Sequence, residues 1–295
     1  KLYQNLPENG DLLILGIIQK RLLIKLAAIL SRWGQAVKES DTFAKQFPWN
    51  VSIVNLYLSI LVQAIEFDDL AKHVNLVPHS ASQEFESLDL DQELDWIEKN
   101  IPQSAIRDKW ILRGKLAIKP SQQIIKEYAK NKPTPEDAVV LMRALKKMDQ
   151  ESTAVQVAKK FPENTEVLIQ RAINSFEQTP QDALESIQKV LSTNNNQPTV
   201  LALSSFILRN LGKTDLAITD LESALAIWQD EINWHKSASE MWFELGNDNK
   251  ATQHMEYVNA ITPGDISNGV KLSKTYLASN NYSDSIELLL SLAAT

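Results

Sequence analysis

Four histidines are the residues best suited to acid–base or metal chemistry in this sequence: His73, His79, His235 and His254. No two of them are spaced to bind a metal from one helix, as the two histidines of an HExxH motif are. The sequence contains neither a GxSxG turn for a nucleophilic serine nor a GxxxxGK(S/T) loop for phosphate. It also lacks cysteine, which removes thiolate catalysis, thiolate metal sites and disulfides. We therefore predict a chain with no enzymatic activity, no cofactor and no metal.

The charged side chains show no nucleic-acid signature. The formal net charge is −7 and the isoelectric point is near 5.3, which disfavours binding through phosphate contacts. Carboxylates gather between residues 83 and 98, at Glu84, Glu86, Asp89, Asp91, Glu93, Asp95 and Glu98. Leu90, Leu94 and Ile97 have helical spacing among them. The segment is therefore either a solvated helix face or a docking surface for a basic partner.

A period of 34 residues organises the last third of the chain. Gly212, Gly246 and Asn280 are separated by this interval, and Gly or Asn tolerates the left-handed backbone that ends a helix. A small residue follows each of them by five positions, at Ala217, Ala251 and Ser285. Apolar residues recur in three further columns, at Leu208, Trp242 and Tyr276, at Leu221, Met255 and Leu289, and at Ala224, Val258 and Leu292. A fixed period of this length predicts helix pairs stacked into a solenoid.

These columns resemble the tetratricopeptide repeat, which has Gly or Asn at its turn, Ala at its eighth and twentieth positions, and Pro near its end. The resemblance is carried by Leu211-Gly212 through Leu225, by Leu245-Gly246 through Thr262-Pro263, and by Tyr276, Asn280, Tyr282 and Ser285. The departures are serines at the eighth position, Ser205, Ser239 and Ser273, and the missing Pro after Leu225. The resemblance implies an all-α fold, a right-handed superhelical solenoid of antiparallel helix pairs. Its repeats would span 198–231, 232–265 and 266–295.

Helix pairs continue towards the N-terminus with less regular spacing. We predict irregular, tetratricopeptide-like pairs in residues 105–197, at 105–118 with 121–131, 136–148 with 151–161, and 165–177 with 181–193. Residues 1–104 are predicted to be degenerate helical repeats, with helices at 10–34 and 38–47 and a pair at 50–65 and 67–76. The three parts are expected to form one continuous solenoid.

Residues 12–30 form the most apolar stretch. Lys20, Arg21 and Lys25 interrupt it, so it is a poor membrane span. Two interpretations remain: a buried pair of solenoid helices, or a helix whose basic residues favour an anionic membrane surface. The chain begins without Met and ends where a second helix closes, so we expect a piece of a longer protein. The sequence leaves its location open between the cytoplasm and a bacterial periplasm or envelope.

The resemblance also implies where a partner would bind, because in this family the first helices of successive pairs line a concave groove. The groove-facing positions implied here are Thr199, Ala202, Phe206, Arg209, Asn233, Lys236, Glu240, Phe243, Ser267, Val270, Lys274 and Leu277. The partner-binding residues predicted among them are Phe206, Arg209, Lys236, Glu240, Phe243, Lys274 and Leu277. Apolar members would hold apolar side chains, and the cations would hold carboxylates or backbone carbonyls. The alternative is that these residues pack on neighbouring helices.

The function predicted from these features is a non-enzymatic scaffold that binds a segment of another protein on its concave face. Family habit alone suggests a setting, a bacterial envelope assembly for secretion or polysaccharide export. A second hypothesis is a peptide-responsive regulatory domain of a larger protein. A third is a self-assembling spacer, because Leu288, Leu289 and Leu292 would be exposed at the end of the stack.

Overall fold

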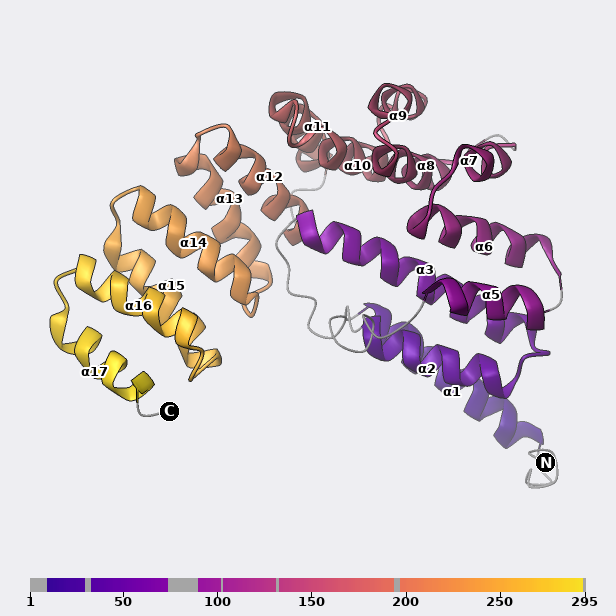
Figure 1. The fold of residues 1–295 in the computed structure, drawn as a ribbon, viewed down its shortest axis with the longest axis horizontal. Helices are drawn as coiled ribbons and strands as arrows, with labels where there is room; N and C mark the ends of the chain where they lie inside the picture. Colours follow the sequence, from indigo (N-terminus) through magenta and orange to yellow (C-terminus); the bar gives the residue numbers. More distant parts are fainter. Residues whose placement is uncertain are drawn as a thin grey trace. The chain divides into compact units, whose positions relative to one another are not determined.

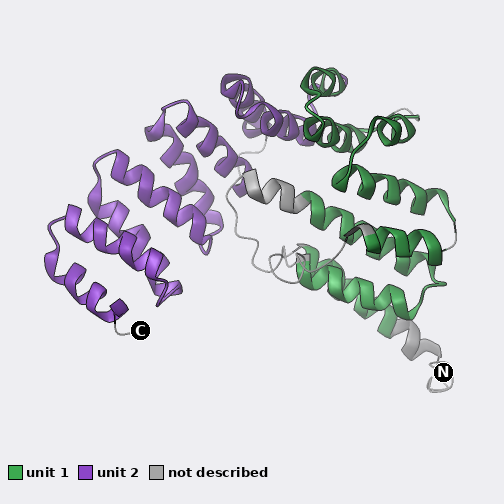
Figure 2. Cartoon of the chain, in the orientation of Figure 1, with its two compact units in different colours: residues 1–71, 78–159 green, residues 72–77, 160–295 purple. Residues whose placement is uncertain are grey.

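The computed structural model describes residues 10–29, 33–73, 90–101, 103–130, 133–193 and 197–293. Every regular element within these ranges is an α-helix (Figure 1). The predicted all-α fold of helix pairs is confirmed. The chain divides into two compact units (Figure 2): unit 1 comprises residues 1–71 and 78–159, and unit 2 comprises residues 72–77 and 160–295. The predicted division into three parts of one continuous solenoid stays a prediction.

Unit 1 is built from α1 (Gly10–Ile29), α2 (Trp33–Gln46), α3 (Val51–His73, except for its last two residues), α5 (Leu90–Asn100), α6 (Ala105–Ile118), α7 (Gln122–Tyr128), α8 (Pro135–Lys147) and α9 (Glu151–Ala158). Some predicted boundaries are wrong here. The helix predicted at 10–34 ends at Ile29, and the helix predicted at 38–47 already begins at Trp33. The pair predicted at 50–65 and 67–76 is one helix as far as His73, because no Gly or Pro interrupts this segment. Residues 74–76 lie outside the described ranges.

The core of unit 1 gathers around α3. Tyr57, Leu58 and Leu61 are fully buried there and belong to a cluster with residues of α1, α2, α5 and α6. The hydroxyl of Tyr57 donates to Glu93 Oε2 of α5 over 2.8 Å. Further along α3, Glu66 accepts two hydrogen bonds of 2.7 Å from Arg113 of α6. The side chain of Glu66 is only 11% exposed, and a carboxylate so removed from water needs such partners. The paired contact joins α3 to α6, and Arg143 of α8 lies 3.6 Å from the same carboxylate.

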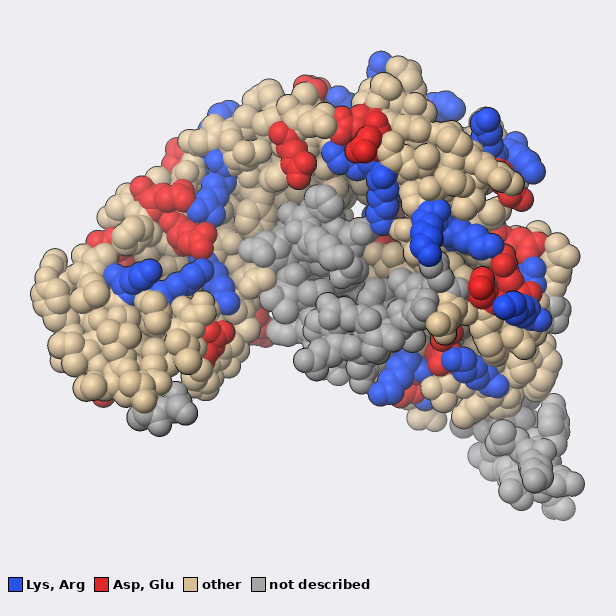
Figure 3. Space-filling model, viewed as in Figure 1, with Lys and Arg blue, Asp and Glu red and all other residues tan. Residues whose placement is uncertain are grey.

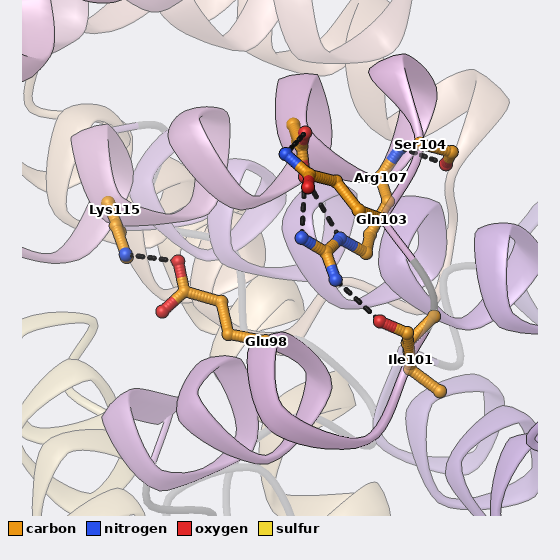
Figure 4. Close-up of polar contacts among 7 residues, drawn as sticks. Glu98, Ile101, Gln103, Ser104, Arg107 and Lys115 are labelled. Carbon is orange, nitrogen blue, oxygen red and sulfur yellow. Dashed lines mark hydrogen bonds and ion pairs between the residues drawn. The ribbon is translucent and has the colours of Figure 1, made fainter.

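The corner between α5 and α6 shows how the chain turns within unit 1 (Figure 4). Ser104 begins α6 as its N-cap, accepting a hydrogen bond from the backbone N–H of Arg107 over 3.2 Å. The guanidinium of Arg107 donates back to the carbonyl of Ile101 over 2.5 Å. Across the two helices, Lys115 Nζ lies 2.5 Å from Glu98 Oε1. These contacts fix the angle at which α6 leaves the turn.

The same corner contains the described part of the acidic segment at 83–98. Glu93 bonds to Tyr57, and Glu98 pairs with Lys115, so both carboxylates are used within the fold. Glu84, Glu86 and Asp89, together with the side chain of Asp91, lie outside the described residues. A docking role for the whole segment therefore stays a prediction.

Unit 2 is built from α10 (Thr165–Ser175), α11 (Pro180–Thr193), α12 (Pro198–Asn210), α13 (Thr214–Ile227), α14 (Ile232–Glu244), α15 (Asp248–Ile261), α16 (Ile266–Ala278) and α17 (Tyr282–Ala293). Each helix packs against the next one along the chain. The residues predicted to end the first helix of each repeat have the left-handed backbone expected there, since Gly212, Gly246 and Asn280 have φ of 72°, 73° and 60°. The small residues five positions later also lie where predicted, because Ala217 and Ala251 are 0% exposed at the contact between two helices.

The serines at the eighth repeat position explain why alanine is not required there. Ser205, Ser239 and Ser273 are all buried. The hydroxyl of Ser239 donates to the carbonyl of Ala251 over 2.8 Å, and Ser273 shares a hydrogen bond of 2.8 Å with Ser285. The hydroxyls of Ser239 and Ser273 are thus satisfied by the second helix of their own pair, whereas the Ser205 hydroxyl lies 3.9 Å from Met241 Sδ on the first helix of the next pair. A side chain one atom larger than alanine is tolerated because its polar atom has a partner.

A polar contact also repeats with the 34-residue period. Trp242 Nε1 of α14 donates to Glu222 Oε1 of α13 over 2.8 Å. In the next repeat, the hydroxyl of Tyr276 on α16 donates to Glu256 Oε1 of α15 over 2.9 Å. Burial and this hydrogen bond raise the pKa of Tyr276 to about 12, so its hydroxyl stays a donor. The two contacts join α14 to α13 and α16 to α15, in each case a first helix to the second helix of the preceding pair.

Candidate interaction surface

The predicted partner-binding residues lie on α12, α14 and α16, the first helices of three successive pairs in unit 2. We call the side of these helices that bears them the first-helix face. Phe243 is 50% exposed, Leu277 is 47% exposed and Val270 is 37% exposed, so large apolar groups reach the surface there. Phe206 is only partly exposed, and Ala202 is fully buried. For Ala202 the groove-facing prediction is wrong, because a small residue at this position packs between helices.

An ionic chain crosses the first-helix face. Arg209 of α12 lies 3.3 Å from Glu240 of α14 and also pairs with Glu244. Glu240 in turn lies 3.6 Å from Lys271 of α16. Acidic and basic side chains accordingly lie side by side on unit 2 in Figure 3. Exposed pairs of this kind each contribute less than about 1 kcal/mol. Their main consequence is that Arg209, predicted to hold a partner's carboxylate, already has two carboxylates of its own chain.

Two cations of the face remain available. Among the described residues, no carboxylate pairs with Lys236 or Lys274. Lys236 and Phe243 are seven positions apart on α14, and Lys274 and Leu277 are three apart on α16, so each cation shares a helix side with an exposed apolar group. The structure therefore offers positive charge next to apolar surface on neighbouring first helices.

A second cluster, which the sequence did not predict, joins α13, α14 and α15. His235 Nδ1 lies 2.8 Å from His254 Nδ1. The other nitrogen of His235 lies 2.9 Å from the carbonyl oxygen of Gln229, and the other nitrogen of His254 lies 3.1 Å from Glu222 Oε1. Tyr257 stacks on His235 with ring centroids 4.1 Å apart. The two histidines are 19 residues apart, which no metal or catalytic motif would have signalled.

The partners of this cluster decide where its protons lie. A carbonyl oxygen only accepts, so His235 Nε2 donates to Gln229, and Nδ1 of the neutral ring accepts. His254 then donates from Nδ1 to His235, and its Nε2 faces the Glu222 carboxylate. The hydrogen bond from His254 holds the pKa of Glu222 below its usual value, and burial lowers the pKa of His235. The two histidines, with Glu222 and Gln229, therefore form a polar joint between three helices.

This joint does not resemble a reaction centre. Each ring nitrogen is occupied by a partner within the joint, and Lys250 covers the Trp242 ring with its ammonium 3.8 Å from the centroid. Within the described residues, no group of three or more His, Asp or Glu side chains is placed to hold a metal ion. In the same ranges, no helix is both long and apolar enough to cross a membrane.

Comparison with known proteins adds a general likeness. No protein-family model matches the sequence, and no curated protein matches it. Solved structures similar to the chain include YrrB, described as a TPR protein with an unusual peptide-binding site, at 14% identity and a TM-score of 0.48 over 57% of this chain and 89% of that one. They also include the APC/C hetero-tetramer Cut9–Hcn1, at 15% identity and a TM-score of 0.48 over 83% of this chain and 53% of that one.

A tetratricopeptide repeat protein from Parabacteroides merdae is similar at 13% identity and a TM-score of 0.46, over 70% of this chain and 78% of that one. Tetratricopeptide repeat proteins are thus among the structures that the chain resembles, in keeping with the resemblance in its sequence. With TM-scores below 0.5, these matches do not assign the chain to a family or identify what it binds.

Proposed function

We propose that the chain is a non-enzymatic scaffold that binds a segment of a partner protein on the first-helix face of unit 2. The observation that carries the proposal is the exposure of Phe243 and Leu277 beside Lys236 and Lys274, whose charges no described carboxylate neutralises. Exposed aromatic and aliphatic groups at the centre of a polar surface are typical anchors of protein interfaces. The ionic chain of Arg209, Glu240 and Lys271 would form the polar rim.

The chemistry of the face defines the segment that it would bind. A bulky apolar side chain would cover Phe243 and Leu277, and a carboxylate nearby would pair with Lys236 or Lys274. Arg209 would contribute through its packing and not as the main anion site, because Glu240 and Glu244 hold it. The proposed setting is a bacterial envelope assembly for secretion or polysaccharide export. Its support is the family resemblance in the sequence.

A peptide library displayed on phage, selected against the purified chain, tests this function. We expect enriched peptides that combine bulky apolar residues with Asp or Glu. A double variant, Phe243→Ala with Leu277→Ala, should weaken the selected peptides about tenfold or more, the effect of losing interface anchors. The matched control is Leu216→Ala with Ile227→Ala, because these residues of α13 are exposed to a similar degree. Peptides that bind both double variants equally would place the site elsewhere.

Self-association is a second candidate function, and α17 favours it. Ile286, Leu289 and Leu290 are 58%, 42% and 67% exposed on this helix. An apolar face of this kind would be covered if a second copy stacked against it. Sedimentation velocity over a range of concentrations would detect the association, and Leu290→Glu should abolish it. A single species at every concentration would leave only the peptide-binding scaffold.

A further inference from the structure

Helix α1 has an unusual charge for this protein. Between Asp11 and Glu39 the sequence contains no carboxylate, although the whole chain has a net charge of −7. The same stretch contains the cations Lys20, Arg21, Lys25, Arg32 and Lys38. Lys20 pairs with Glu39 of α2. Within the described residues no carboxylate pairs with Arg21 or Lys25, so α1 presents positive charge that the fold does not neutralise.

One side of α1 is packed and the other is not. Ile24, Ala27 and Ala28 are buried in the core of unit 1. Four large aliphatic side chains of the same helix are half exposed or more: Ile18 at 50%, Leu22 at 62%, Leu23 at 55% and Leu26 at 50%. A helix that is apolar on all sides is normally enclosed on all sides. In α1 an aliphatic surface that contains two unpaired cations remains open.

The charge of this surface decides between its possible occupants. A second copy that paired through α1 would bring the Arg21 and Lys25 side chains of both copies together, and like charges in an interface oppose binding. A partner must instead supply negative charge and accept aliphatic side chains. The boundary between anionic headgroups and acyl chains does both, since leucines enter the acyl region while Lys and Arg extend to the headgroups.

We propose that the open side of α1 binds an anionic lipid surface. Leu22, Leu23 and Leu26 enter the boundary of the acyl chains, and Arg21 and Lys25 contact headgroup phosphates. The helix lies in the plane of the surface, because its opposite side stays packed on unit 1. This site is separate from the first-helix face of unit 2, so it does not depend on the proposed scaffold function.

Sedimentation of the full chain with lipid vesicles tests the proposal. We expect at least about tenfold stronger binding to vesicles that contain phosphatidylglycerol than to pure phosphatidylcholine, and weaker binding at high salt. The variants Arg21→Glu with Lys25→Glu, and Leu22→Ser with Leu26→Ser, should each reduce binding to the anionic vesicles about tenfold or more. The control Lys159→Glu with Lys160→Glu changes the net charge by the same amount on exposed residues and should bind like the unchanged chain. Inorganic phosphate should not compete, because the aliphatic contacts are missing.

A fluorophore reports whether α1 itself enters the surface. The chain has no cysteine, so Leu22→Cys provides a unique attachment point for an environment-sensitive dye. Its emission should shift to the blue with anionic vesicles and stay unchanged with phosphatidylcholine. Thermal melting of each variant shows that it is folded. Equal binding to both lipids, equal binding by the α1 charge variant, or no binding by the folded chain would each overturn the proposal. Lipid-free dimers abolished by Leu22→Ser with Leu26→Ser would overturn it in favour of a second copy.

Discussion

Unit 1 and unit 2 are both made of helix pairs, but different residues hold the pairs together. In unit 2 the close contacts repeat one small residue per pair, such as Ala217 and Ala251, which are 0% exposed. In unit 1 the core around α3 instead contains contacts that occur once, such as those of Tyr57 with Glu93 and of Glu66 with Arg113. A repeated contact needs only a neighbouring repeat, whereas a unique contact needs one particular partner. Substitutions should therefore act differently in the two units.

The largest effect is expected at Glu66 of unit 1, whose carboxylate pairs with Arg113 and lies 3.6 Å from Arg143 of α8. Glu66→Gln keeps the size of the side chain but leaves the guanidinium of Arg113 without its carboxylate. We expect unit 1 to lose about 3 kcal/mol of unfolding free energy, since removing one partner of a largely buried pair leaves an uncompensated charge. Urea unfolding followed by hydrogen exchange measures the loss in each unit. Glu98→Gln, in a partly exposed pair with Lys115, serves as control and should cost less than about 1 kcal/mol. Equal costs for both would contradict the ranking.

The next effect is expected at the repeated small residue of unit 2. Ala251→Phe places a large ring where two helices meet, and overpacking of this kind costs about 1–3 kcal/mol. The melting temperature of unit 2 should fall, and amide hydrogen exchange in α14 and α15 should become faster at constant pH. Ala226→Phe introduces the same ring at an exposed position of α13 and should change little. A melting temperature that is unaffected by Ala251→Phe would contradict the proposed register of the repeats.

A glycine-to-alanine substitution should have opposite signs in the two units. Gly246 ends α14 with φ of 73°, where an L side chain is strained, so Gly246→Ala should cost about 1 kcal/mol although its surroundings are open. Gly16 lies within α1 with nothing near an added methyl group, so Gly16→Ala should stabilise unit 1 by about 0.5–1 kcal/mol. Equilibrium unfolding of the two variants checks the signs. The same sign in both would contradict the backbone argument.

The smallest effect is a pH dependence confined to the histidine joint of unit 2. Burial lowers the pKa of His235, so the folded state resists its protonation, and stability falls as the pH drops below about 6.5. Glu222, whose pKa is also lowered, adds a loss that begins only at more acidic pH. We expect lower protection factors in α13, α14 and α15 on acidification, after hydrogen exchange has been corrected for its intrinsic dependence on pH. Replacing His235 and His254 by Gln should flatten this dependence, and an unchanged profile would refute the role of the joint.

The fold of unit 2 could be predicted from the sequence because the same residue types recur every 34 residues. The positive φ of Gly212, Gly246 and Asn280 and the burial of Ala217 and Ala251 follow from the residue types in register. In unit 1 the predicted break between helices at 50–65 and 67–76 falls at Glu66, a charged residue within α3. Its partner Arg113 lies 47 residues away, and no periodicity connects the two. The helix boundary was wrong at Glu66 because the partner that neutralises its carboxylate is distant in the sequence.

The candidate surface was readable in part. The exposure of Phe243 and Leu277 agrees with their repeat positions, but the engagement of Arg209 by Glu240 and Glu244 was missed. A signal for it exists, because Arg209 precedes Glu240 by 31 residues and Glu240 precedes Lys271 by the same interval. This spacing is three residues short of the repeat, and it brings successive first helices into contact. The histidine joint had no such signal, since its shared hydrogen bond depends on the rotamers of both rings.

The hydrogen bond from Trp242 to Glu222 recurs one repeat later as the bond from Tyr276 to Glu256, so two successive junctions of unit 2 use the same kind of contact. A gene in which residues 232–265 were duplicated in tandem would encode a second Trp242 opposite the first Glu256, so the new seam would find its donor and acceptor already in place. Arrays of this chain can therefore lengthen by copying one repeat, without inventing a new junction.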